Sequence, residues 1–122
     1  MVKLCDEQVK DLLQKNAIIQ VDPDSMGFIS NFFVIPNASG GFRPIFNLKA
    51  LNNFIPTVHF KMEGIHLLKD SIREGDWFAK LDLKDAYLTV PVYSGDQKFL
   101  HFLWKGNRFQ YRCLPFGLSS VP

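Results

Sequence analysis

An apolar run that leads into two carboxylates constrains this chain more than any other feature. Residues 77–81 read WFAKL, which predicts a strand, and residues 81–87 continue as LDLKDAY. Asp82 is therefore expected where a buried strand reaches solvent, with Asp85 three residues further on. A carboxylate in that position is a natural ligand for a hard cation such as Mg²⁺. On these residues alone the alternative is favoured, in which Asp82 caps a short helix and Asp85 completes a capping box.

The other elements of the sequence predict an α+β fold. Apolar spacing indicates one helix near the N-terminus, with Asp6 as its N-cap, and a second over residues 62–73. Residues 28–35 and 42–47 flank a Gly-rich turn and predict a β-hairpin, in which Pro44 should lie on an edge strand. A second hairpin is expected around the turn KGN at residues 105–107. The mixed order of helices and hairpins is typical of α+β domains rather than of βαβ units.

Composition bounds the fold more than the function. The 122 residues suffice for one domain or part of one, and an apolar content of 47% with twelve Phe predicts an aromatic-rich core. The net charge of +2 neither favours nor excludes nucleic-acid binding. Cys5 and Cys113 lack metal-ligand spacing, and no apolar run approaches the roughly 20 residues of a membrane span. We expect a soluble intracellular chain, cytoplasmic or nuclear, without membrane association.

Three segments resemble reverse transcriptases, and they follow the order found in that family. Residues 40–52, GGFRPIFNLKALN, resemble the strand and turn of the fingers; residues 81–87 resemble the first catalytic motif; residues 114–122, LPFGLSSVP, resemble the next palm motif. The amino-acid sequence of these segments most resembles that of tyrosine-recombinase (DIRS-type) retrotransposons, with gypsy-like elements next. The resemblance extends from about residue 12 to residue 122. It implies a partial right-hand polymerase fold, with a fingers β-hairpin and the N-terminal part of an antiparallel palm sheet packed on helices.

The resemblance assigns roles in two-metal nucleotidyl transfer to residues of the first motif. Asp82 would bind both Mg²⁺ ions, and the backbone carbonyl of Leu83 would be a further metal ligand. Asp85 and Ala86 would offer backbone N–H groups to the triphosphate of the incoming deoxynucleotide. Tyr87 would be a steric gate that excludes the ribose 2′-hydroxyl. The alternative for Tyr87 is a core aromatic residue packed under the helix.

Four further residues receive nucleotide or template roles from the same resemblance. Arg43 would clamp the triphosphate, because a guanidinium suits bidentate phosphate contact. Lys49 would position the RNA or DNA template. Phe116 and Gly117 would lie against the incoming nucleotide and the template base. The alternative for Arg43 is a solvated strand residue paired with a carboxylate, and the alternative for Lys49 is a solvated turn lysine. For Phe116 and Gly117 the alternative is a Pro-Phe-Gly turn that anchors the end of the second hairpin.

The second metal-binding motif of this family is absent from the sequence. Reverse transcriptases place Tyr-x-Asp-Asp a few tens of residues beyond the Leu-Pro-x-Gly segment, and no Asp-Asp pair occurs in this chain. We therefore expect a partial domain over residues 1–122, fingers-like to about residue 75 and palm-like from about residue 76. One carboxylate is too little for two metal ions, so weak or absent Mg²⁺ binding and no polymerase activity are expected from this chain alone.

A second departure from the family lies at the tip of the fingers hairpin. Related elements often carry the tip PKKDGG, whereas residues 36–41 read PNASGG, without either lysine. Each lost lysine removes a positive charge that could meet the triphosphate. The alternative reading is therefore a decayed or co-opted retroelement remnant that binds nucleic acid or a protein partner. An incomplete sheet would also expose an apolar edge, which predicts self-association.

Overall fold

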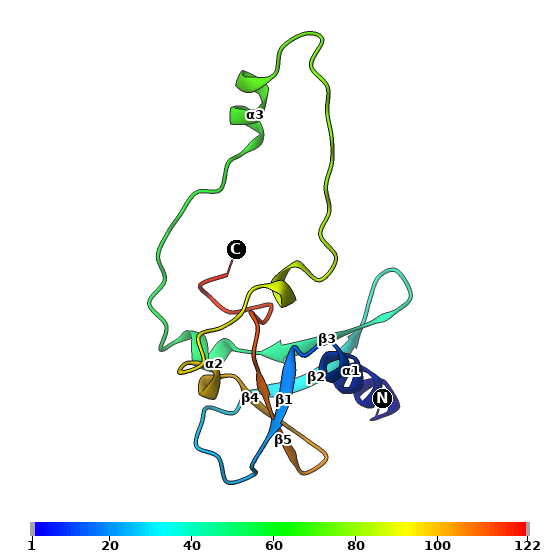
Figure 1. Cartoon of the computed structure of the whole chain (residues 1–122), viewed down its shortest axis with the longest axis vertical. Helices are drawn as coiled ribbons and strands as arrows, with labels where there is room; N and C mark the ends of the chain where they lie inside the picture. Colours follow the sequence, from blue (N-terminus) through cyan, green and yellow to red (C-terminus); the bar gives the residue numbers. More distant parts are fainter. Residues whose placement is uncertain (1, 122) are drawn as a thin grey trace.

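The computed structural model describes residues 2–121, which form a folded body from which one long segment extends (Figure 1). Helices and antiparallel strands follow one another in a mixed order without a βαβ unit, and the predicted α+β class is confirmed. In chain order the elements are α1 (Val2–Gln14), β1 (Ile18–Val21), β2 (Asn31–Pro36), β3 (Phe42–Asn47), α2 (Lys49–Asn52), α3 (Ile65–Ser71), the 3₁₀ turns η1 (Ala86–Thr89) and η2 (Gln97–Phe99), β4 (His101–Trp104) and β5 (Asn107–Tyr111). Every helix among the described residues is too short or too polar to cross a lipid bilayer.

The strands form two antiparallel sheets, and both predicted hairpins are confirmed. β1, β5 and β4 make a three-stranded sheet in that order, while β2 and β3 pair with each other. The turn between β4 and β5 places Lys105 and Gly106 at positive φ, as a two-residue hairpin turn requires. Pro44 lies opposite Val34 in the two-stranded sheet, where each strand is an edge, so its missing N–H costs no ladder bond.

A cluster of aromatic rings joins the two sheets. Phe102 on β4 is completely buried, and its ring stacks on that of Phe32 from β2 at 4.5 Å between centroids and on that of Phe109 from β5 at 5.4 Å. Phe46 on β3 stacks in turn on Tyr111 of β5 at 4.9 Å. Because each pair adds ring contact to the burial of apolar area, this cluster stabilises the contact between the sheets. It confirms the aromatic-rich core that twelve Phe predicted.

Helix α1 packs one face on this core and begins earlier than the sequence suggested. Its buried residues are Cys5, Val9 and Leu12. Asp6 lies inside the helix, so its assignment as N-cap was wrong. Its carboxylate accepts hydrogen bonds from the indole N–H of Trp104 and the ammonium of Lys105. The Lys105 bond, then the Trp104 bond, holds the pKa of Asp6 below its usual value.

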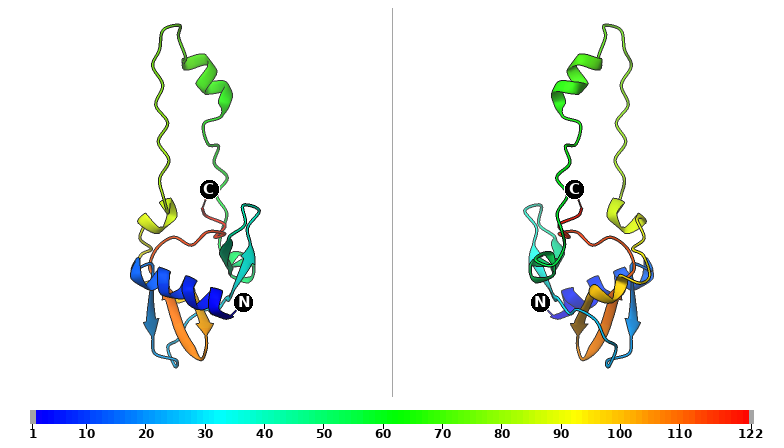
Figure 2. Two further views of the ribbon diagram at one scale, coloured as in Figure 1. Left: turned by 90° about the vertical axis from the view of Figure 1, so that its right-hand side faces the viewer. Right: turned by 90° about the vertical axis from the view of Figure 1, so that its left-hand side faces the viewer.

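The segment that extends from the body spans residues 56–84, here called the arm (Figures 1 and 2). Every residue from 56 to 85 is exposed, including Trp77 at 98% and Leu81 at 87%. The strand predicted over residues 77–81 is absent, because a strand needs a neighbour for its backbone N–H and C=O groups and no described segment pairs with it. The helix predicted over residues 62–73 forms only as α3, without a buried residue.

Candidate functional site

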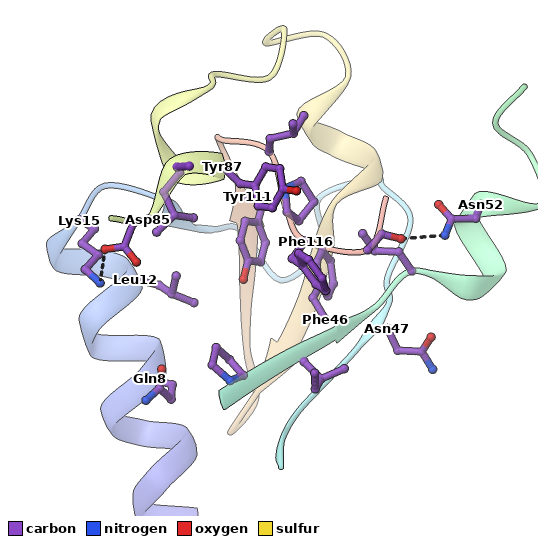
Figure 3. Close-up of a pocket in the computed structure, with 18 of the residues that line it drawn as sticks. Gln8, Leu12, Lys15, Phe46, Asn47, Asn52, Asp85, Tyr87, Tyr111 and Phe116 are labelled. Carbon is purple, nitrogen blue, oxygen red and sulfur yellow. Dashed lines mark hydrogen bonds and ion pairs between the residues drawn. The ribbon is translucent and has the colours of Figure 1, made fainter. Parts of the chain in front are cut away.

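A cavity of about 670 Å³ opens on one side of the folded body (Figure 3). Four stretches of chain line it: one face of α1, the segment from β3 into α2, the start of η1, and residues 114–117 after β5. These stretches are far apart in the sequence and meet only because β5 pairs with β1 and the aromatic cluster draws β3 onto β5. The volume falls within the range of small-ligand pockets.

The cavity brings together six of the nine residues to which the sequence gave roles. They come from all three of the segments that carried the resemblance: Lys49, Asp85, Ala86, Tyr87, Phe116 and Gly117. The wall formed by these segments is largely aromatic. The rings of Tyr87 and Phe116 lie 5.8 Å apart and are tilted by 50°, and Tyr111 stacks on Phe46 behind them. Such a wall suits a flat, partly apolar ligand such as a nucleobase.

Asp85 is the residue at which the chain re-enters the body from the arm. Its backbone is left-handed, with φ 53° and ψ 40°, and it precedes η1 without a side-chain cap bond. Its carboxylate instead pairs with the Lys15 ammonium at 3.0 Å, and Lys15 also pairs with Asp11 at 2.7 Å. These bonds, with Asp11 first, raise the pKa of Lys15. The capping-box alternative is therefore wrong, because the helical turn begins after Asp85 and its side chain turns to α1.

Asn52 fixes the opposite side of the cavity, and sequence reasoning missed it. Its amide donates to the carbonyl of Gly117 at 2.9 Å and its oxygen accepts from the backbone N–H of Ser119 at 2.8 Å. Gly117 has φ 100°, a conformation that L side chains rarely adopt. The bidentate contact thus holds Phe116 and Gly117 in place against the cavity. The sequence indicated this role only weakly, through a polar residue directly after an apolar one, Leu51, which is buried in the structure.

Burial also changes the pKa values of two groups at or near the cavity. Tyr111 is buried on β5, and removal of its phenol from water raises the pKa far above the usual value of a tyrosine. The nearby Cys113 thiol is likewise raised in pKa by burial. Both groups are therefore neutral at physiological pH, and the charged residues that line the cavity are Asp11, Lys15, Lys49 and Asp85.

Three of the predicted residues lie outside the cavity. Asp82 and Leu83 are exposed on the arm, and Arg43 is exposed on β3 opposite Ile35. The Asp82 carboxylate and the Leu83 carbonyl are hard oxygen donors of the kind Mg²⁺ prefers, but two ligands do not fix such an ion. Within residues 2–121 no group of three His, Cys, Asp or Glu side chains could hold a metal. The described residues therefore do not make a complete site for a magnesium ion, and we assign no metal-dependent step to them.

Comparison with known proteins identifies the family. A family model described as reverse transcriptase (RNA-dependent DNA polymerase) matches residues 35–122. The Tf2-3 and Tf2-7 transposon polyproteins of Schizosaccharomyces pombe (strain 972 / ATCC 24843) are each 32% identical over 88 residues, which is 72% of this chain and 7% of each polyprotein. The chain thus spans a small part of the length of these relatives.

Solved structures agree on the fold. The foamy viral protease-reverse transcriptase in complex with dsDNA aligns with a TM-score of 0.74 over 94% of this chain and 24% of its own, at 16% identity. Its complex with an RNA/DNA hybrid aligns with a TM-score of 0.68 over 92% of this chain and 15% of its own, at 17% identity. Together with the three sequence motifs, these matches show that the chain belongs to the reverse transcriptase family and corresponds to a segment of a retrotransposon reverse transcriptase.

Proposed function

We propose that this chain provides the nucleotide pocket of an RNA-directed DNA polymerase. The observation that supports this most is the convergence of three separate motifs on one cavity of about 670 Å³. The sequence motifs alone assign nucleotide or template roles to residues 49, 85–87 and 116–117. All of these residues line that cavity. A chance match of short motifs would not bring their key residues to one ligand-sized space.

The proposed ligand is a deoxynucleoside triphosphate beside a template base. Phe116 and Gly117 would contact the base, and the ring of Tyr87 would exclude a ribose 2′-hydroxyl. The half-buried position of Tyr87, 5.8 Å from the Phe116 ring, supports a steric role, because a packed ring yields little space. The backbone N–H groups of Asp85 and Ala86 would face the phosphates.

Template–primer binding is the second part of the proposal. The foamy viral enzyme has been solved with dsDNA and with an RNA/DNA hybrid, and we propose the same class of partner for this chain. Lys49 lies at the edge of the cavity and is exposed, so its ammonium is free to meet a template phosphate. Arg43 would reach the triphosphate from the hairpin only after movement toward the cavity.

Catalysis requires more than this chain supplies. Asp82 and Leu83 would contribute to a Mg²⁺ site that needs further carboxylates, and the metal would supply activation of the primer hydroxyl and neutralisation of the triphosphate. We expect no primer extension by the 122 residues alone. The exposed apolar residues of the arm, Trp77 foremost, favour in addition a self-associating protein at high concentration.

Nucleotide titration of the 122-residue chain tests the pocket. We expect dCTP to bind more tightly than CTP by roughly tenfold, the discrimination that a steric clash of about 1.4 kcal/mol gives. Tyr87→Ala should bring the two affinities together, while Tyr93→Ala, at a 75% exposed residue outside the cavity, should leave their ratio unchanged. Equal affinity of the wild-type chain for the two nucleotides would contradict the assignment of Tyr87.

A further inference from the structure

An ion pair between the residue after α1 and the residue after the arm has no role in the function proposed so far. Lys15, directly after α1, pairs with Asp85 at 3.0 Å, and the same ammonium pairs with Asp11 one helical turn earlier at 2.7 Å. Figure 3 shows Lys15 and Asp85 facing each other at the rim of the cavity, with Tyr87 further along the same strip of chain. All three charged side chains line the cavity with Tyr87.

The backbone at Asp85 explains why such a contact matters. Its φ of 53° is a left-handed conformation that L residues adopt at a cost, and Asp is one of the few that tolerate it. The turn is closed by the N–H of Leu88, which donates to the Asp85 carbonyl at 2.9 Å, and Tyr87 lies inside that turn. Residues 56–85 are all exposed, so burial of the preceding chain does little to hold the turn in place. The ion pair joins it to α1, which is packed on the core.

We propose that Lys15 is a positioning residue for nucleotide selection: its ion pair with Asp85 fixes the left-handed turn that holds Tyr87 against Phe116 in the cavity. The consequence for selection rests on the proposed function, because it requires Tyr87 to act as the gate. The effect of the ion pair on the position of the Tyr87 ring does not depend on the proposed function. Lys15 acts through Asp85 and touches no nucleotide.

A direct role of Lys15 as a phosphate ligand fits the geometry less well. Its ammonium already pairs with two carboxylates, and these bonds raise its pKa, so a phosphate would have to displace one of them. Asp11 is placed four residues before Lys15, the spacing at which an acidic and a basic side chain meet on a helix. Asp11 thus directs the ammonium toward Asp85 rather than toward solvent.

The first test uses the ligand-free chain. The ring signals of Tyr87 in an NMR spectrum report its distance from Phe116, and the exposed Tyr93 serves as an internal reference. Lys15→Glu should move the Tyr87 signals toward those of an exposed tyrosine, Lys15→Arg should retain them, and Lys10→Glu, a charge reversal elsewhere on α1, should not affect them. Asp85→Asn gives an independent variant that keeps the left-handed preference and removes the charge. Unchanged Tyr87 signals in both folded variants would overturn the proposal.

The second test measures the ratio of dissociation constants for CTP and dCTP. Lys15→Glu should lower this preference by about threefold, the effect of one partly exposed ion pair, and Lys15→Arg should restore it. Because salt screens such a pair, wild-type chain in about 1 M salt should approach the variant. Failure of the chain to bind either nucleotide would refute the proposed function, while the Tyr87 signals would still decide the role of Lys15. Normal discrimination by the folded Lys15→Glu variant would refute the role of Lys15 alone.

Discussion

Truncation of Phe102 is the perturbation that most directly tests how the two sheets are held together. Phe102 has no exposed surface and contacts rings from both sheets, including the stacked Phe32 and Phe109. Phe102→Ala should therefore leave a cavity at the point where the sheets meet. The neighbouring β2 residue Phe33 is 41% exposed and provides a matched control for the same substitution.

The expected loss of unfolding free energy follows from this burial. A fully buried Phe changed to Ala costs about 3–5 kcal/mol, and the ring pairs that Phe102 makes place it at the upper end of that range. At about 0.05–0.15 kcal/mol per residue, a chain of 122 residues has a total stability of roughly 6–18 kcal/mol. The variant should thus lose a quarter to more than half of its stability. Phe33→Ala should lose under about 1 kcal/mol, because its side chain is already partly in water.

Urea unfolding followed by far-ultraviolet circular dichroism measures both variants. With a slope of about 1–3 kcal/mol per molar urea, the midpoint of Phe102→Ala should fall by about 2 M, and that of Phe33→Ala by less than about 0.5 M. Phe102→Leu should give an intermediate value. Equal losses at the two positions, or a loss under about 1 kcal/mol at Phe102, would show that the aromatic cluster does not join the sheets.

Three further substitutions have defined outcomes. Burial raises the pKa of Tyr111, so the neutral phenol contributes fully to stability below about pH 10, where the unfolded phenol ionises. Above that pH the unfolding free energy should fall by about 1.4 kcal/mol per pH unit. Tyr111→Phe should remove this fall, which urea unfolding between pH 10 and 11 would measure. Asn52→Ala should cost about 1–3 kcal/mol through the loss of two hydrogen bonds and should weaken dCTP binding, which titration would show. Gly27→Ala would place Cβ 2.6 Å from the buried ring of His101 and should lower stability by about 1–3 kcal/mol, whereas Gly41→Ala meets no atom and should not; comparable thermal melts would contradict this.

The parts of the fold that depend on local pattern could be predicted from the sequence. Both hairpins follow from apolar runs around Gly-containing turns, and the structure adds that Lys105 and Gly106 have positive φ in the second turn. The strand over residues 77–81 could not form for a different reason. Its apolar pattern is suited to a sheet, but strand formation needs a pairing partner, and within the described residues none lies beside it.

The candidate site likewise contains residues that the sequence could identify and residues that it could not. Residues inside recognisable motifs, such as Tyr87 and Phe116, were predicted and meet in one cavity. Asn52 and Lys15 could not be predicted, because their roles depend on contacts across 65 and 70 residues of chain with Gly117 and Asp85. Such contacts require the folded arrangement in which β1 pairs with β5 and α1 packs on the core.

The arm also divides the folded body into two interlocked pieces of chain. Residues 2–55 contribute α1 and β1–β3, and residues 85–121 contribute β4 and β5, yet β1 pairs with β5 and Phe32 stacks on Phe102 across that division. Each piece therefore supplies a surface that the other completes, as two subunits of a heterodimer do. To the association of the two pieces the arm contributes the entropy of loop closure. This contribution changes by about 0.6 kcal/mol when the length of a loop doubles. A protease cut within the arm should consequently leave the two pieces associated, and evolution could lengthen or shorten this connection without dismantling the cavity beneath it.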